Sequence, residues 1–149
     1  MCFKIYKNHP LPKYADKDII CYKVTDNNKI KENNFISIVK EFKYKYDTLY
    51  ILDTPLEIEL IKHSEKKTEY NIEKGFHSYS NYNNASGWIE CSIIKCIIPK
   101  GSTYYFNPVR QEYVSDKIKI GKYNEINIKP INIFLDVFNY LLYKIKMIL

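Results

Sequence analysis

The stretch KGFHSYSNYNNASGWIECSIIKCIIPKGSTYYFNPVRQEYVSDKIKI, residues 74–120, decides the fold. Short apolar, β-branched and aromatic runs alternate in it with turn residues, which is typical of strands joined by tight turns. Gly101, in the Pro-Lys-Gly-Ser segment, is predicted to supply the positive φ of one such turn. Strands are therefore predicted at Phe76–Tyr79, Ile89–Ile98, Thr103–Phe106 and Val114–Ile120, with further pairing around Asn124–Ile128.

The first half of the chain is predicted to mix strands with one helix. Asp18–Val24 is apolar and β-branched, which indicates an inner strand, and Asp26–Lys29 should then form a turn. A helix is predicted over Asn34–Tyr46, because apolar residues recur there at the i, i+3, i+4 and i+7 positions. The other expected elements are a strand after Met1, short strands at Tyr50–Leu52 and Glu57–Lys62, and a charged loop at His63–Glu69.

The C-terminal segment Ile133–Leu149 predicts an amphipathic helix. Its charged residues and its length argue against a membrane span, which needs about 20 apolar residues. We expect the helix to pack against the sheet or to form a homo-oligomer, and binding to a membrane surface is the alternative. One stripe of the helix is apolar and consists of Phe134, Val137, Phe138, Leu141, Ile145 and Ile148.

Composition predicts a single domain over residues 1–149, because a chain of this length buries one core. The abundance of Lys, Ile, Asn and Tyr matches AT-rich codons and suggests a viral, phage or low-GC bacterial protein. No secretory signal precedes the first strand, so a cytoplasmic location is expected, in the host cytoplasm if the protein is viral. The chain contains no P-loop, GxGxxG, HExxH or Gly-x-Ser-x-Gly motif, which argues against the enzyme classes that use them.

The formal net charge of +6 permits binding to nucleic acid, but no block of five like charges occurs, which favours a solvated surface. No metal site is predicted. Cys91 and Cys96 should point to opposite faces of a strand and so would not chelate together. Cys2 would be an N-terminal nucleophile if Met1 were removed, although its surroundings equally fit an edge strand.

Three segments resemble the ADP-ribosyltransferase family. Cys21-Tyr22-Lys23 is similar to the family's first strand, which ends in an aromatic residue and a basic residue that holds NAD. Gly75–Ser80 is similar to its Gly-aromatic-x-Ser-Thr-Ser strand, whose serines shape the nicotinamide pocket. Ile97–Ser102 is similar to the segment that leads to the last catalytic strand. The resemblance implies an α+β fold with a split, twisted, mostly antiparallel sheet flanked by helices.

The family's catalytic glutamate has two candidate positions in this chain. Matching the apolar register of residues 117–120 puts Lys117 at that position. A lysine there would oppose the cation that develops as nicotinamide leaves, by about 4 kcal/mol at 4 Å and an effective dielectric of 20. Another register uses Glu112 instead and restores the acid. Arg110 stands out as the only arginine of the chain, a residue favoured for binding phosphate.

The sequence therefore predicts a protein that binds a nucleotide-type ligand, such as an ADP-ribose derivative or a cyclic nucleotide, without catalysing a reaction. It also predicts that the protein uses no cofactor. In a virus or phage such a binder would sequester an immune signal. The first alternative is an ADP-ribosyltransferase or NAD glycohydrolase that uses Glu112 and takes NAD as substrate. The second is a module that binds protein or single-stranded nucleic acid. The candidate ligand-binding residues are Tyr22, Lys23, His77, Ser78, Tyr79, Ser80 and Arg110.

Strand alternation limits how these residues share a pocket. Side chains on a strand point to opposite faces in turn, so Phe76, Ser78 and Ser80 should face one way and His77 and Tyr79 the other. A regular strand would thus not present all of them to one ligand. The alternative to a binding site is an ordinary strand end, with Phe76 in the core and its polar neighbours in solvent.

Overall fold

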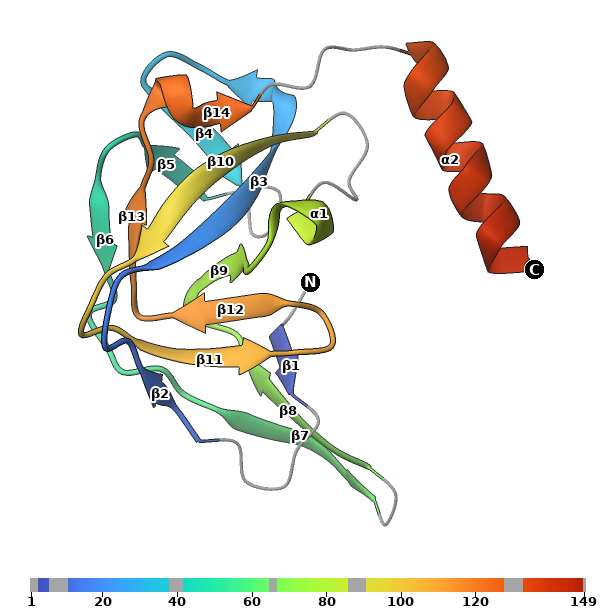
Figure 1. Ribbon diagram of the computed structural model, residues 1–149. Coiled ribbons are helices and arrows are strands. Elements are labelled where there is room, and N and C mark those ends of the chain that lie inside the picture. The colour runs from blue at the N-terminus through green and yellow to red at the C-terminus, as the bar shows by residue number, and fades with distance from the viewer. Residues whose placement is uncertain are drawn as a thin grey trace.

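Two long antiparallel strands, β3 (Ile19–Ile30) and β10 (Cys91–Ile98), form the centre of the main sheet (Figure 1). Apolar, β-branched residues dominate β10, and most of its side chains are buried, as expected for a strand covered on both faces. The computed structural model describes residues 3–5, 11–37, 42–64, 67–85, 91–127 and 133–148, and all of its strand pairings are antiparallel.

The main sheet extends from this central pair in both directions. Its strand order is β2 (Lys13–Tyr14), β11 (Thr103–Asn107), β12 (Glu112–Ser115), β9 (Phe76–Tyr79), β3, β10, β13 (Lys117–Ile120) and β6 (Leu49–Ile51). Three short strands attach to this path, namely β4 (Asn34–Ser37), β5 (Lys43–Lys45) and β14 (Ile126–Asn127). A smaller sheet has the order β1 (Phe3–Ile5), β8 (Lys67–Ile72) and β7 (Glu59–Ser64).

The outer edge of β3 divides the main sheet into two arms. Tyr22 pairs with Tyr79 of β9, whereas Thr25 and Ile30 pair with residues of β4. One arm is therefore β9, β12, β11 and β2, and the other is β4 and β5. The main core fills the space that these arms and the central strands enclose, with buried side chains that include Phe35, Tyr44, Phe76, Ile94, Ile98, Ile118 and Ile120.

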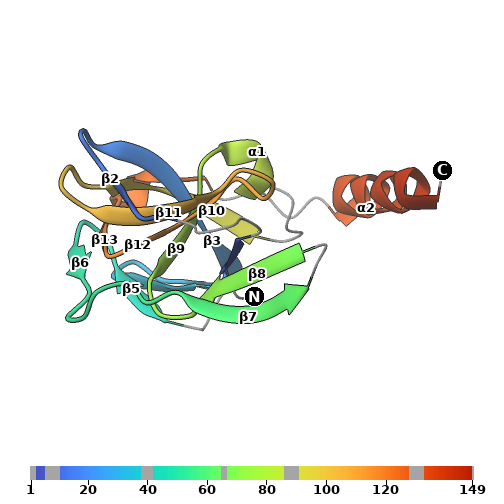
Figure 2. The same cartoon turned by 90° about the horizontal axis from the view of Figure 1, so that it is seen from below.

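A second, smaller core joins the two sheets. Ile72 of β8 packs with Tyr105 of β11 and Val114 of β12, and Leu56 and Ile58 cover this group. The hairpin of β7 and β8 thus lies beside the first arm, as Figure 2 shows from below. This contact anchors the segment between β6 and β7.

The expected sheet flanked by helices is wrong. Within the described residues the helical elements are α1 (Tyr82–Ala85), a single turn, the 3-10 turn η1 (Tyr123–Glu125), and α2 (Ile133–Ile148). The fold is mostly antiparallel sheet, and the buried side chains of its described cores come mainly from strands. The apolar residues pair across arms, so no layer of helices is needed to bury them.

The predicted helix over Asn34–Tyr46 is also wrong, because β4 and β5 occupy its described parts. Phe35 is fully buried, and its ring stacks on Tyr44 with 5.5 Å between centroids. The pairing of β4 with both β3 and β5 satisfies backbone groups that a helix would satisfy locally. The helical spacing also depended on Ile38 and Val39, which lie outside the described residues.

Three smaller corrections concern connections and strand bounds. β3 continues through the turn predicted at Asp26–Lys29, with a register shift between Thr25 and Ile30. The loop predicted at His63–Glu69 falls within β7 and β8 where it is described. The predicted strand Val114–Ile120 is split at Asp116, whose carboxylate accepts a hydrogen bond of 2.9 Å from the Thr103 amide.

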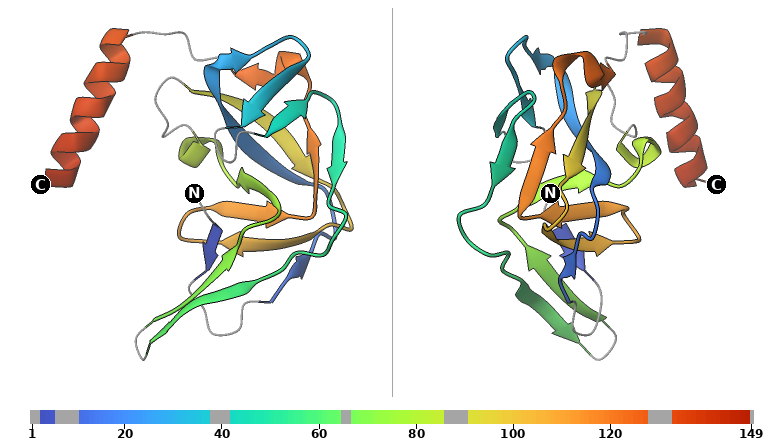
Figure 3. Two further views of the ribbon diagram at one scale, coloured as in Figure 1. Left: turned by 180° about the vertical axis from the view of Figure 1, so that it is seen from behind. Right: turned by 60° about the vertical axis from the view of Figure 1, so that its left-hand side comes forward.

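Other predictions are confirmed. β9 has the predicted bounds, and the segments predicted as strands around Asp18–Val24 and Thr103–Phe106 are strands, as is the described part of Ile89–Ile98, which begins at Cys91. Gly101 has a φ of +88° in its turn. The C-terminal helix forms as predicted, but the expected packing against the sheet is not observed, since α2 lies apart from the strands in both views of Figure 3.

No helix in the described ranges is long and apolar enough to cross a membrane.

Candidate functional site

Five side chains form one row across five neighbouring strands of the main sheet. Residues that lie directly opposite each other in an antiparallel pair share a face of the sheet. The strand registers place Lys95 opposite Tyr22, Tyr22 opposite Tyr79, Tyr79 opposite Glu112, and Glu112 opposite Asn107. We call these five residues the cross-strand row. Its centre combines two half-buried tyrosines with a half-buried carboxylate.

The tyrosines of the row rest on a small apolar cluster. Tyr22, Tyr79 and Tyr82 of α1 pack on the group formed by Val24, Ala85, Cys91 and Ile93. The rings of Tyr22 and Tyr82 meet edge to face, with 6.1 Å between centroids. Each tyrosine packs on this apolar group and is only half-buried, so the cluster offers exposed aromatic surface at a fixed position.

The hairpin loop between β11 and β12 positions the polar end of the row. The side-chain oxygen of Asn107 accepts hydrogen bonds from the amides of Val109 and Arg110, at 2.9 and 3.2 Å. Gln111 adopts a left-handed conformation with φ of 55°, and its side-chain amide donates to the Pro108 carbonyl. This turn returns the chain so that Arg110 lies near Glu112, close enough for its charge to act on the carboxyl.

Ser80 ties this loop to the end of β9. Its amide donates to the Gln111 carbonyl at 2.8 Å, and its hydroxyl donates to the Gln111 side-chain oxygen at 2.6 Å. The predicted residues Ser80 and Arg110 therefore lie at the same end of β9 and β12 as Tyr79. The Ser80 hydroxyl is already engaged, so its role here is to hold the loop.

Burial raises the pKa of the Glu112 carboxyl above its usual range. The Arg110 charge and a hydrogen bond from the Tyr79 hydroxyl oppose this rise. The site thus offers two cationic side chains, Arg110 and Lys95, the Glu112 carboxyl as an acceptor, and tyrosine ring faces. This combination suits a ligand with an aromatic ring and an anionic group.

Lys23 and Ser78, two of the predicted ligand-binding residues, lie on the other face of the sheet. Both are buried, with exposed fractions of 6% and 3%. The Lys23 ammonium donates a 2.6 Å hydrogen bond to the His77 carbonyl and lies 4.6 Å from the centroid of the Tyr44 ring. Neither residue can reach a ligand on the cross-strand row, and Lys23 instead links the two arms of the sheet.

His77 shares the face of Tyr79 but lies further along β9. It sits opposite Val114, whose side chain belongs to the second core. The predicted alternation along β9 is therefore observed: Phe76 and Ser78 are buried, whereas His77 and Tyr79 are half-buried. His77 is therefore the next residue on this face of β9 after Tyr79, about 7 Å along the strand, and it lies outside the row.

The two candidate positions for the catalytic glutamate are well separated in their surroundings. Glu112 lies in the cross-strand row beside Tyr79. Lys117 lies on β13 opposite Ile51 and borders a different pocket of about 490 Å³, together with Tyr14, Tyr105 and Asp116. The geometry therefore brings Glu112, and not Lys117, to the predicted residues Tyr22, Tyr79, Ser80 and Arg110.

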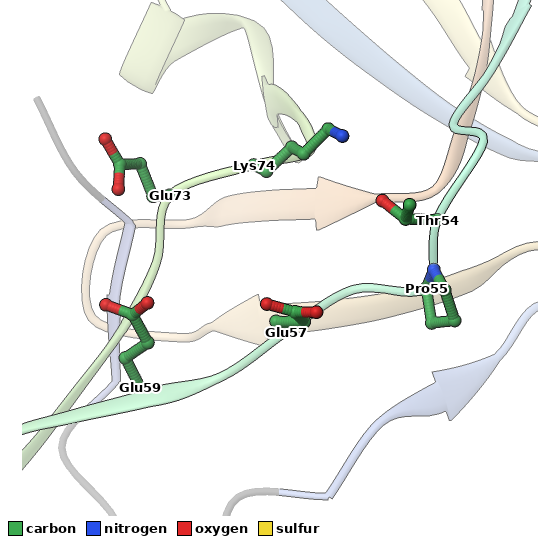
Figure 4. A pocket seen from close by; sticks show the side chains of 6 residues that line it. All are labelled: Thr54, Pro55, Glu57, Glu59, Glu73 and Lys74. Atoms are coloured by element: carbon green, nitrogen blue, oxygen red, sulfur yellow. The ribbon is translucent and has the colours of Figure 1, made fainter.

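A further pocket of about 500 Å³ lies at the opposite end of β9 (Figure 4). Three carboxylates line it, and Figure 4 shows that Glu57 and Glu59 come from the chain at the start of β7 and Glu73 from the chain just after β8. Lys74 also lines this pocket, and its ammonium pairs with the Asp53 carboxylate at 3.4 Å. Among the described residues no group of three His, Cys, Asp or Glu side chains could hold a metal ion. The residues that line this acidic pocket are Thr54, Pro55, Glu57, Glu59, Glu73 and Lys74.

Sequence reasoning missed several members of the site. Tyr82 lies between the strands predicted at Phe76–Tyr79 and Ile89–Ile98, and only the turn of α1 brings it to Tyr22. Lys95, Asn107 and Gln111 enter through strand register and turn conformation. The one available signal for Asn107 was its place before Pro108, a pair of residues that favours a turn.

Comparison of the chain with protein-family models, with curated proteins and with solved structures found no match.

Proposed function

We propose that this protein binds a nucleotide-type ligand, such as an ADP-ribose derivative or a cyclic nucleotide, along the cross-strand row without turning it over. The observation that carries the proposal is the register, which aligns Tyr22, Tyr79 and Glu112 on one face next to Arg110. These residues come from three separate segments of the chain. Their convergence concentrates ring faces, a cation and an acceptor in one place.

Each part of such a ligand has a matching group. A base can stack on a tyrosine ring, which contributes about 1–3 kcal/mol per base. The Arg110 guanidinium can bind a phosphate through paired hydrogen bonds. Glu112 can accept a hydrogen bond from a ribose hydroxyl or a base amino group. Lys95, exposed at the end of the row, adds positive charge for a second phosphate.

The electrostatics of Glu112 favour binding over turnover. A carboxylate that stabilises a developing ribosyl cation must be ionised and directed at that cation. The Arg110 charge, which acts on the Glu112 carboxyl, would repel the cation. Two unit charges 4 Å apart interact by about 4 kcal/mol at an effective dielectric of 20, so a cation at that distance could offset the gain from one carboxylate.

The experiment is a calorimetric titration of the purified chain with ADP-ribose and with cyclic AMP, preceded by mass spectrometry of small molecules released on denaturation. Tyr79→Ala and Arg110→Ala should each weaken binding about tenfold or more, as expected for loss of a stacking or phosphate contact. Tyr14→Ala is the control, since this exposed tyrosine lies outside the cross-strand row and borders the pocket that Lys117 lines. Equal losses in all three variants would contradict the proposed site.

The competing function is an NAD glycohydrolase or ADP-ribosyltransferase that uses Glu112. The position of Glu112 beside Tyr79 and Arg110 supports it, because these groups would meet the ribose and a phosphate of NAD. Incubation with NAD and detection of nicotinamide decide between the two. Release that is lost in Glu112→Gln would replace the binder with an enzyme. Salt-sensitive binding to single-stranded oligonucleotides, with none to mononucleotides, would instead favour a nucleic-acid module.

A further inference from the structure

Helix α2 exposes large apolar side chains to solvent. Phe138, Leu141, Leu142, Ile145 and Ile148 have exposed fractions of 51%, 52%, 40%, 51% and 83%. None of them belongs to a hydrophobic core of the described residues. Figures 1 to 3 place α2 apart from both sheets in every view. An exposed apolar patch of this kind marks a surface that another partner covers.

These five residues share one side of the helix. At about 100° per residue they span an arc of about 120°. Lys144 and Lys146 fall on either border of this arc, each about 40° beyond the last apolar residue. Tyr140, Tyr143 and Met147 lie on the opposite side, and the Lys144 ammonium is 5.6 Å from the centroid of the Tyr140 ring.

We propose that α2 lies on an anionic lipid surface, with the apolar arc in the acyl boundary and the two lysines at the headgroups. Long basic side chains at the borders of an apolar face can keep their charge in water while their stems lie along the lipid. The net charge of +6 gives the whole chain an attraction to an anionic leaflet. Charge complementarity therefore selects lipid as the occupant.

A second copy of the chain fits the same helix less well. Two-stranded helix pairs bury a narrow seam, whereas the apolar arc of α2 is wide. Two chains of charge +6 also repel one another, while an anionic membrane attracts each of them. Half-immersion in a lipid surface covers the whole arc at once, without requiring partners on several sides.

The test is flotation of the 149-residue chain with vesicles of phosphatidylcholine, with or without phosphatidylglycerol. We expect binding to the anionic vesicles and little to the neutral ones. Lys144→Gln and Lys146→Gln should each lower the partition coefficient about fivefold, because a basic residue near an anionic surface contributes about 1 kcal/mol. Leu141→Asp should abolish binding, and Met147→Asp, with the same charge change on the opposite side, should retain more of it.

Three results would overturn this proposal. One is equal binding to neutral and anionic vesicles, and another is an equal loss in Leu141→Asp and Met147→Asp. The third is an absence of vesicle binding together with a dimer in sedimentation analysis that Leu141→Asp dissociates, which would assign α2 to a second copy. The lysine variants leave the apolar arc intact, so they test the charge argument even if the aspartate variants alter the helix.

Discussion

Protonation of the Glu112 carboxyl makes the stability of the fold depend on pH. Because burial raises its pKa above the ordinary value of 4.5, the folded chain holds the Glu112 proton at pH values where the unfolded chain has released it. The folded state then binds more protons, so stability falls as pH rises through the interval between 4.5 and the raised value. This contribution is fully favourable only below that interval.

We predict that Glu112→Gln removes this part of the pH dependence, while Tyr79→Phe and Arg110→Ala extend it to higher pH. The last two changes take away the hydrogen bond and the charge that oppose the pKa rise. Thermal unfolding measured over a pH series checks this. Parallel pH profiles for the original chain and Glu112→Gln would show that burial of this carboxyl has no energetic effect.

The buried cysteines should be unreactive in the folded protein. Cys21, Cys91 and Cys96 are buried, and burial raises the pKa of Cys21 to about 11 and that of Cys96 still further above its usual range. At pH 8 about one Cys21 side chain in a thousand would be a thiolate, the reactive form. Iodoacetamide labelling followed by peptide mapping should find these three cysteines modified only in denaturant. Labelling of Cys21 under native conditions would contradict its burial, and mapping separates the signal from Cys2, which lies outside the described residues.

Among the strands and their turns, Gly121 permits the closest backbone approach. A Cβ atom at this position would lie 2.2 Å from the Lys95 carbonyl oxygen, and that oxygen belongs to the central strand β10. Gly101 is different, because its φ is +88° but nothing lies within 4 Å of an added Cβ. Gly121 is therefore limited by contact and Gly101 by backbone conformation.

We predict that Gly121→Ala destabilises the fold by about 3 kcal/mol, at the upper end of overpacking effects, since backbone must move to relieve the contact. Gly101→Ala should cost about 1 kcal/mol, the strain of a left-handed residue. Urea denaturation of both variants compares the two costs. A larger loss for Gly101→Ala would mean that β10 yields easily at Lys95.

Strands were predictable where the period-two pattern is local and strong, as in β9 and β10. The helix predicted over Asn34–Tyr46 is wrong although its apolar residues fit the helical period, because a pattern of four residues is weak evidence for a helix. The segment forms strands because Phe35 of β4 pairs with Tyr44 of β5 and β4 also pairs with β3. Such long-range pairing overrides local preference and leaves no mark in the segment's own sequence.

The same limit applies to the site. Tyr22 and Lys23 were predicted together, yet neighbours on a strand face opposite ways, so only one of them can belong to the row. Tyr79, Arg110 and Glu112 were each named from the sequence. Their arrangement depends on the register between β9 and β12 and on the left-handed Gln111, which a single sequence does not specify.

Over the whole molecule, the described hydrophobic cores and the C-terminal helix α2 are separate parts of the structure. Buried side chains of the described cores come from the sheets, from α1 and from the segments next to them, and none comes from α2. The cross-strand row is likewise built from strands, and the β11–β12 loop positions Arg110 beside it. Folding and ligand binding should therefore be separable from whatever covers α2.

We predict that a chain shortened to end at Asn127 has nearly the same thermal midpoint as the 149-residue chain. The change in its free energy of unfolding should stay within the usual range for surface substitutions, roughly 0.5 kcal/mol. It should also keep any affinity for ADP-ribose, because the row is intact, and lose binding to anionic vesicles. Calorimetric melting, titration and flotation measure these three properties on one pair of proteins. A large fall in the melting temperature would show that α2 packs on the sheet in solution, and the division of the molecule proposed here would then be wrong.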